Sequence, residues 1–144
     1  MCDPMVRVMA SGVFDILHTG HISYLQQAKA LGDELIVVVA CDETVRKSKH
    51  EPITNEKMRV QIIGSLKPVD KAVLGKGGDI FDVVKEISPD IIVLGFDQTF
   101  KEKDLRKRLG ENGLGHIEVA RASEYAEDLT ATRRIIEKIR KLEG

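Results

Sequence analysis

The sequence predicts a single α/β domain over residues 1–144, built on a mostly parallel five-stranded sheet with helices on both faces. Short apolar runs alternate with stretches of helical spacing along the whole chain, as in repeated strand–helix units. Residues 35–40 form a continuous, largely β-branched apolar run, which is typical of a strand buried on both faces. A chain of 144 residues is long enough to bury one core.

The expected elements follow from periodicity and from the residues that begin and end helices. Strands are expected at residues 5–10, 35–40, 69–74, 91–94 and 116–120. Helices are expected at residues 20–31, 55–66, 79–87, 100–109 and 130–142. Thr54 is the candidate N-cap of the second helix. The charged, non-periodic residues 46–51 are expected to form a surface loop.

The composition excludes several classes of protein. A net charge of −1 and the absence of Trp argue against a general nucleic-acid surface. No apolar run is long enough to span a membrane. Cys2 and Cys41 do not form a disulfide framework, which favours a reducing, cytoplasmic location. We therefore expect small-molecule partners, with no nucleic acid and no membrane.

The segment that follows the first strand carries the strongest functional signal. An apolar run ends at Gly12, and His18 and His21 then flank Gly20 at the start of a helical pattern. The first amides of a helix lack partners within the helix and carry partial positive charge, so this arrangement forms an anion site. Two imidazoles add hydrogen-bond donors at neutral pH. The pattern indicates chemistry on a phosphate.

The predicted topology brings a second loop to this site. Ligands of parallel α/β sheets bind at the carboxyl ends of the strands, where the strand order reverses. We expect a Rossmann-like order of 3-2-1-4-5, with the reversal beside the first strand. Residues 12–21 and residues 95–98, which follow the first and fourth strands, then face each other.

Other phosphate and metal motifs are weaker or absent. The two histidines could bind a metal, but a zinc site needs three or four ligands, and the remaining His and Cys residues show no ligand spacing. No metal ligand is therefore predicted. The Gly-x-Gly-x-x-Gly fingerprint does not follow the first strand, and residues 75–78 lack the end of a Walker loop, so they are expected to form a plain turn.

The segment Gly12-x-Phe14-Asp15-x-x-His18-x-Gly20-His21 resembles the signature of the cytidylyltransferase-like nucleotidyltransferases. The resemblance spans nearly the whole chain in order. It continues through Asp42, Lys47, Lys49, Glu56-x-x-Arg59, Val69-Asp70 and Gly95-x-Asp97. Within that family the sequence resembles the archaeal FAD synthases, which are FMN adenylyltransferases, above all in residues 35–46, 66–72 and 89–99.

The resemblance implies a reaction in which AMP passes from ATP to FMN, giving FAD and pyrophosphate. It implies catalytic roles for His18, His21, Lys47 and Lys49. It implies nucleotide contacts at Val13, Phe14, Asp15, Thr19, Gly20, Arg59, Gly95, Asp97, Tyr125, Thr130 and Thr132. Mg²⁺ is expected with the triphosphate. A homodimer is expected from the resemblance and from the frequency of twofold symmetry.

Simpler interpretations of some of these residues stay open. Arg59 could be a surface cation paired with Glu56, and Tyr125 could be a packed loop aromatic instead of a contact to adenine. Arg133 and Arg134 lie in the first turn of the last predicted helix, where the helix dipole favours acids. Cations at that position indicate an anion nearby.

Two other functions also stay open. The first is another nucleotidyltransferase of the same fold, using CTP on glycerol 3-phosphate or another small phosphorylated acceptor, or ATP on a sugar phosphate. The second is a nucleotide-binding domain without turnover. Bacterial glycerol-3-phosphate cytidylyltransferases end in an Arg-Thr-Glu-Gly-Ile-Ser-Thr-type motif, and residues 121–134 differ from it in spacing. That difference argues against CTP.

Overall fold

The computed structural model describes residues 5–48, 51–96, 98, 101–124 and 132–143. Its five strands are all parallel and lie in the order β3-β2-β1-β4-β5, which confirms the predicted class and strand order. The strands are β1 (Arg7–Gly12), β2 (Glu34–Val39), β3 (Lys71–Leu74), β4 (Ile91–Leu94) and β5 (Glu118–Arg121). The helices are α1 (Thr19–Lys29), α2 (Asp42–Lys47), α3 (Glu56–Gly64), α4 (Ile80–Ile87), α5 (Glu102–Glu111) and α6 (Thr132–Glu143).

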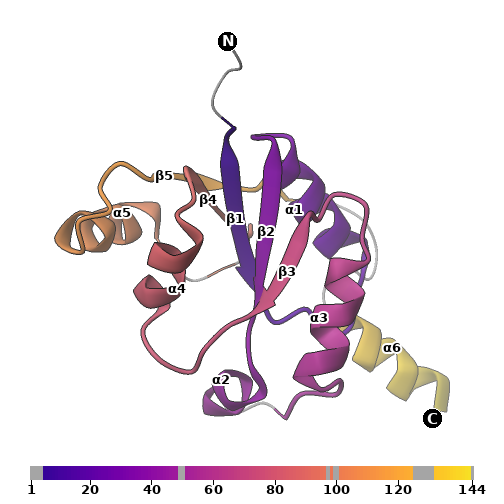
Figure 1. Cartoon of the computed structure of the whole chain (residues 1–144). Coiled ribbons are helices and arrows are strands. Elements are labelled where there is room, and N and C mark those ends of the chain that lie inside the picture. Colours follow the sequence, from indigo (N-terminus) through magenta and orange to yellow (C-terminus); the bar gives the residue numbers. More distant parts are fainter. Residues whose placement is uncertain (1–4, 49–50, 97, 99–100, 125–131, 144) are drawn as a thin grey trace.

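Two apolar layers cover the two faces of the sheet. Alternate residues of β2 enter different layers: Leu35 and Val37 pack with residues of α1 and α3, whereas Ile36 and Val38 pack with residues of α4 and α5. Figure 1 shows α1 and α3 on one side of the sheet and α4 on the other. This double burial explains the continuous apolar run of β2. Within the described residues, no helix is both long and apolar enough to cross a bilayer.

The carboxyl ends of the strands meet at one edge of the sheet, towards α2 (Figure 1). β1 pairs with β2 on one side and with β4 on the other, where Ala10 is opposite Val93. The chain reaches β4 only after completing β3 at the far edge, so the strand order reverses between β1 and β4. The loops after β1 and β4 are therefore neighbours, as predicted.

One local prediction is wrong. Residues 46–51 were expected to form a loop, but Arg46 and Lys47 are the last residues of α2. Acidic residues occupy the first turn of this helix and basic residues the last turn, an order that favours the helix dipole. Only Val45 of α2 is buried, so a helix of six residues leaves no apolar period in the sequence.

The N-cap of α3 also differs from the prediction. Asn55, and not Thr54, caps the helix, because its side chain accepts a hydrogen bond from the amide of Met58. The first strand ends later than expected, since Ser11 and Gly12 pair with Val38 and Val39. Gly12 is therefore the last residue of β1. The Thr54 side chain does not cap α3, and its hydroxyl is left to bind Asp15.

Candidate active site

The loop after β1 is built around a buried aromatic ring. Phe14 is 4% exposed and has a φ of 55°, a left-handed conformation that costs a non-glycine residue about 1–3 kcal/mol. Its ring meets His21 edge-on, with centroids 5.3 Å apart, and stacks on Tyr24 at 6.5 Å. A Cβ on Gly12 would lie 2.9 Å from the Phe14 ring. The glycine therefore lets Phe14 pack behind His21.

The two histidines cap α1 reciprocally. The Gly20 amide donates to Nδ1 of His18 at 3.1 Å, and the His18 amide donates to Nδ1 of His21 at 3.4 Å. A ring nitrogen that accepts a hydrogen bond carries no proton, so each neutral ring has its proton on Nε2. The rings stack with centroids 3.8 Å apart. The pair therefore carries its ring protons on Nε2 and forms one compact unit.

This capping corrects one part of the predicted anion site. The sequence predicted a helix start whose first amides are free to bind a phosphate, but the Gly20 amide already has the His18 ring as its partner. The positive end of α1 is thus covered by imidazole, and the histidine side chains become the groups that a ligand would meet.

His21 is neutral at physiological pH. Burial, and then the neighbouring His18, lower the pKa of His21 from 6.5 to about 4. A neutral imidazole still donates one hydrogen bond from Nε2. The ring can therefore stabilise added negative charge on a phosphate without first losing or gaining a proton.

Asp15 holds the segment before α3 against the loop after β1. Its carboxylate accepts hydrogen bonds from the amides of Ile53 and Thr54, at 2.9 and 2.8 Å, and from the Thr54 hydroxyl at 2.8 Å. Burial raises the pKa of Asp15, but these hydrogen bonds and the Arg59 charge outweigh it and lower the pKa below its ordinary value. Asp15 is therefore an ionised anchor between two loops.

Arg59 lies beneath the site and is fully buried. Its guanidinium donates to the carbonyls of Val13, Ala40 and Thr54 at 2.9, 2.6 and 3.1 Å, and to the Asp42 carboxylate at 2.5 Å. The interpretation of Arg59 as a surface cation paired with Glu56 is therefore wrong. Glu56 instead accepts from the Asp42 amide at 2.9 Å. The structure gives Arg59 protein partners in three segments, which are the loop after β1, the stretch from β2 into α2, and the residues before α3.

The loop after β4 is held from two sides. The Gln98 side chain accepts from the Gly95 amide and donates to the Ser11 carbonyl, both at 2.9 Å. The Arg121 guanidinium donates to the carbonyls of Gly95 and Gln98, both at 2.9 Å, and pairs with Glu102. Gln98 thereby links the carboxyl ends of β1 and β4 across the point where the strand order reverses.

Tyr24 adds a second link between these strand ends. Its hydroxyl donates to the Val93 carbonyl at 2.6 Å and accepts from the Ser11 amide at 3.2 Å. Burial raises the pKa of the hydroxyl, so it stays protonated. Periodicity placed Tyr24 on the first helix but gave no sign of its hydroxyl contacts, which depend on the packing of α1 against the sheet.

These elements enclose a pocket of about 520 Å³, which we call the histidine pocket. It is lined by Ser11, Gly12, Val13, Phe14, Asp15, His21, Tyr24, Val45, Ser48, Glu51, Ile53, Gly95, Gln98, Arg133 and Ile136. His21, Asp15 and Arg133 give it a polar wall, and Arg133 comes from the first turn of α6. The volume is in the range of small-molecule sites.

The remaining predicted site residues either lie at the ends of helices or fall outside the described residues. Lys47 ends α2 and is exposed, with an ion pair to Glu43 at 3.4 Å. Thr19 begins α1 and Thr132 begins α6. Lys49, Asp97, Tyr125 and Thr130 lie outside the described residues. Within the described ranges, no group of three or more His, Cys, Asp or Glu side chains could hold a metal ion.

Comparison with known proteins identifies the family. A family model described as Cytidylyltransferase-like matches residues 9–138. The chain belongs to the cytidylyltransferase-like family. Relatives of this cytidylyltransferase-like protein include FAD synthase of Aciduliprofundum boonei, 53% identical over 94% of this chain and 91% of the relative. FAD synthase of Thermoplasma acidophilum is 49% identical over 97% of this chain and 98% of the relative.

A solved structure shares the fold at similar identity. It is described as a lipopolysaccharide core biosynthesis protein of Thermoplasma volcanium. It is 50% identical, has a TM-score of 0.82, and covers 85% of this chain and 99% of its own. Because identity and coverage are both high, this chain shares the arrangement of strands described above with that solved structure.

Proposed function

We propose that this protein is an FMN adenylyltransferase that transfers AMP from ATP to FMN, with the complex of ATP and Mg²⁺ as the nucleotide substrate. The observation that carries the proposal is the stacked pair of His18 and His21, in which His21 lines a pocket between the ends of β1 and β4. The FAD synthases of two archaea, each about half identical over nearly the whole chain, supply the acceptor.

The chemistry requires positioning more than acid–base catalysis. An oxygen of the FMN phosphate attacks the α-phosphorus of ATP, the bond from that phosphorus to the bridging oxygen breaks, and pyrophosphate leaves with the electron pair. The attacking phosphate is already an anion, so no strong general base is needed. The residues must align the two phosphates and stabilise charge that moves to the leaving oxygens.

We propose that His18 and His21 stabilise the charge that moves to the leaving oxygens. Their rings are fixed through Nδ1 and through stacking, so Nε2–H needs no reorganisation during the reaction. A hydrogen bond to a charged group contributes roughly 1.5–3 kcal/mol. Arg133, which lines the same pocket, adds a positive charge for the triphosphate. Lys47 and Lys49 are proposed to assist the pyrophosphate from the end of α2 and the residues that follow it.

The residues of the histidine pocket indicate how Mg²⁺ would be bound. Asp15 lines the pocket, but its carboxylate already accepts three hydrogen bonds, and the described residues form no ligand cluster. Mg²⁺ would therefore arrive on the nucleotide, bound mainly by phosphate oxygens and water, and would neutralise the β- and γ-phosphates.

Further expectations from the sequence belong to the same proposal. We propose that residues 1–144 act as one nucleotidyltransferase domain, that the protein works in the cytoplasm, and that it forms a homodimer. The contacts of Val13, Thr19, Gly20, Gly95, Asp97, Tyr125, Thr130 and Thr132 with the nucleotide are proposed in the same sense. For Phe14 and Arg59 the surrounding contacts favour support of the site from behind, in place of direct contact with ATP.

One observation favours a second candidate. The solved structure from T. volcanium is described by a role in lipopolysaccharide core biosynthesis, so a sugar phosphate is an alternative acceptor. The test is pyrophosphate release in a matrix of two nucleotides, ATP and CTP, and three acceptors: FMN, glycerol 3-phosphate and a sugar 1-phosphate. Release and FAD formation with ATP and FMN are expected. Release only with another acceptor or with CTP, or nucleotide binding without release, would contradict the proposal.

A further inference from the structure

A second pocket lies on the opposite side of the strand ends from α1. It has a volume of about 790 Å³ and lies between the sheet and α4. Met9, Val38 and Ile92 of three parallel strands form its floor, and Phe81 and Val84 of α4 face them. We call it the apolar pocket. The histidine pocket needs none of these side chains.

From this geometry we infer that the apolar pocket holds the isoalloxazine ring of the flavin acceptor. The inference rests on the proposed function and adds to it the place and the residues of acceptor recognition. A tricyclic flavin ring is flat and apolar over both faces, with polar atoms concentrated at its pyrimidine edge. Small-molecule sites of roughly 300–1,000 Å³ are typically apolar with a few placed polar groups.

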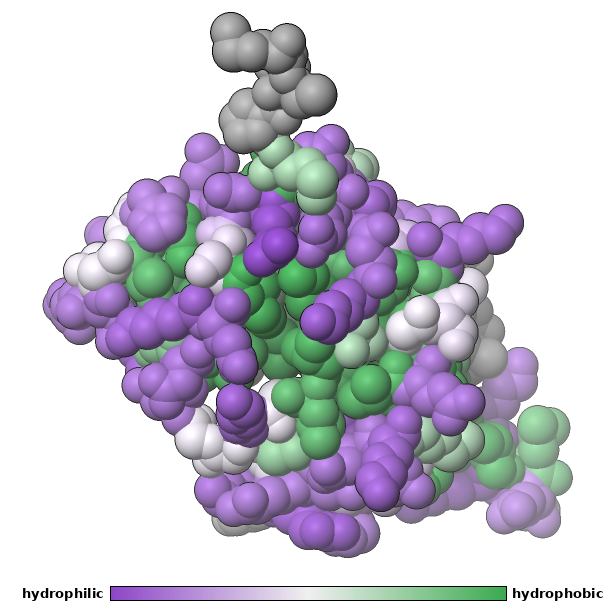
Figure 2. Space-filling view, in the orientation of Figure 1, coloured by the Kyte–Doolittle hydropathy of each residue, from purple (hydrophilic) through white to green (hydrophobic). Residues whose placement is uncertain are grey.

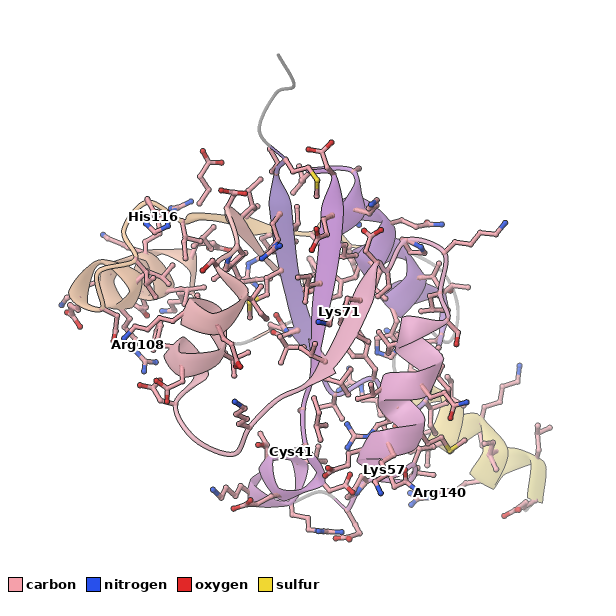
Figure 3. The ribbon with its side chains drawn as sticks, in the orientation of Figure 1. Cys41, Lys57, Lys71, Arg108, His116 and Arg140 are labelled. Atoms are coloured by element: carbon pink, nitrogen blue, oxygen red, sulfur yellow. The ribbon has the colours of Figure 1, made fainter. Side chains whose placement is uncertain are left out.

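Polarity within the apolar pocket changes along the strand direction. Met9 and Ile92 come from the middle of their strands, so the deep part of the pocket is apolar. Cys41 and Thr44, at the start of α2, line the pocket beyond the carboxyl end of β2, and their thiol and hydroxyl are 3.2 Å apart. Figure 3 shows Cys41 where β2 passes into α2. The pocket therefore offers apolar contact in its depth and hydrogen-bonding groups at its rim.

The two pockets share a wall, so one ligand can extend from one pocket into the other. Ser11, Gly12, Val13 and Gln98 line both the apolar pocket and the histidine pocket. Gln98 is held by its hydrogen bonds to Gly95 and Ser11, so the shared wall is fixed. An acceptor with its ring in one pocket and its phosphate at the other must carry a short flexible chain between them. The ribityl chain of FMN is such a link.

The rim also exposes apolar surface to water. Val13 is 39% exposed and Ile80, the first residue of α4, is 38% exposed, and both line the pocket. Figure 2 shows apolar surface gathered over the centre of the view, where the sheet lies between α4 and α3 in Figure 1. A flavin ring would cover apolar surface there at about 25 cal/mol per Å².

The adenine ring of ATP is the competing occupant. Adenine is smaller and carries hydrogen-bonding nitrogens around most of its edge, and burying them without partners costs free energy. The strand and α4 residues deep in the pocket are apolar and offer no side-chain partner. The flavin ring fits both the volume and the polarity better.

The first test uses the wild-type protein and lumiflavin, which has the ring but neither the ribityl chain nor the phosphate. Lumiflavin is expected to bind, with a change in its fluorescence, and to inhibit FAD formation competitively against FMN but not against ATP. Competition against ATP, or no binding at concentrations up to its solubility limit, would overturn the inference.

Variants locate the site. Val84→Phe fills the hollow from α4, and Ile80→Glu places a charge at the rim, where the start of a helix tolerates an acid. Each is expected to raise the KM for FMN and the Kd for lumiflavin at least about tenfold, equal to about 1.4 kcal/mol, with less than about a twofold change in the KM for ATP. Ile139→Glu, at a position of α6 that is 49% exposed, is the matched control and should change none of the three constants.

The outcomes separate the two proposals. If wild-type protein makes no FAD but binds lumiflavin, and Val84→Phe and Ile80→Glu abolish that binding, the proposed transfer fails and the flavin pocket stands. If wild-type protein makes FAD and both variants keep its affinities for FMN and lumiflavin, the transfer stands and the pocket assignment is wrong.

Discussion

The guanidinium of Arg59 is fully buried and lies 2.5 Å from the carboxylate of Asp42. The same guanidinium donates to carbonyls in the loop after β1, at the end of β2 and before α3. One side chain from α3 thereby sets the relative positions of the segments that carry Val13 and Lys47. Its structural importance follows from these contacts.

Arg59→Met should therefore lower both stability and turnover. Removing one partner of a buried ion pair leaves the other charge unpaired and typically costs about 3–5 kcal/mol. Urea unfolding should show a loss of this size, and Arg59→Met/Asp42→Asn should recover part of it. Arg59→Lys keeps the charge but loses the several hydrogen bonds of the guanidinium. The fall in kcat, expressed as a free energy of activation, should therefore exceed the fall in the free energy of unfolding. Lys107→Met, at an exposed position of α5, is the control.

Gly12→Ala should impair the site through Phe14. The new Cβ would lie 2.9 Å from the Phe14 ring, so the ring that backs His21 has to move. Overpacking of this kind costs typically 1–3 kcal/mol, and we expect kcat to fall at least about tenfold. Thermal unfolding and steady-state kinetics measure the two effects.

Gly110→Ala is the matched control for this substitution. Gly110 lies in α5 with open space around the added Cβ, so alanine should leave kcat unchanged and stabilise the protein by up to about 1 kcal/mol. If Gly12→Ala behaves like Gly110→Ala, the packing role assigned to Phe14 is wrong.

Substitutions at the adjacent residues Thr54 and Asn55 should affect different properties, turnover at Thr54 and stability at Asn55. Asn55→Ala removes the N-cap of α3 and should cost about 1 kcal/mol of stability with little change in kcat. Thr54→Val removes the hydroxyl that donates to Asp15 and should reduce turnover more than stability. Circular dichroism melts and initial rates distinguish the two positions, and equal effects on kcat would contradict the assignment.

Stability should fall on the acid side because of His21. Its pKa is about 4 in the folded protein and about 6.5 when unfolded, so the unfolded state binds more protons between these values. The contribution of His21 is complete above pH 6.5 and is lost as the pH falls towards 4, by up to about 3 kcal/mol. Unfolding between pH 4 and 7 should show a shallower pH dependence in His21→Gln than in the wild type, and parallel curves would contradict the shifted pKa.

The sequence alone predicted the class of the fold and the strand order, and it predicted that the loops after β1 and β4 are neighbours. The apolar run of β2 and the spacing around His18 and His21 were the patterns that carried these predictions. A strand buried on two faces appears as a continuous apolar run, and a strand end appears as a glycine after that run. The six-residue helix α2 was missed because Val45 is its one buried residue.

The supporting contacts of the site could not be predicted from spacing. Arg59 looked like a surface cation because a single charged residue on a helix usually is one, and its burial depends on three loops that meet only in the folded chain. Gln98, Tyr24 and Arg121 likewise act through contacts between segments distant in sequence. Such contacts leave no periodic pattern.

The most direct measurement of the central claim is the turnover number of histidine variants with ATP and FMN. Because the Nε2–H groups are proposed to stabilise the charge of the leaving pyrophosphate, His18→Ala and His21→Ala should each lower kcat at least about 10²-fold. Gln places its amide NH₂ near the position of Nε2, whereas Asn reaches only to that of Nδ1, so His21→Gln should keep more activity than His21→Asn. Near-normal kcat in both alanine variants, with pyrophosphate release and FAD formation intact, would contradict the account.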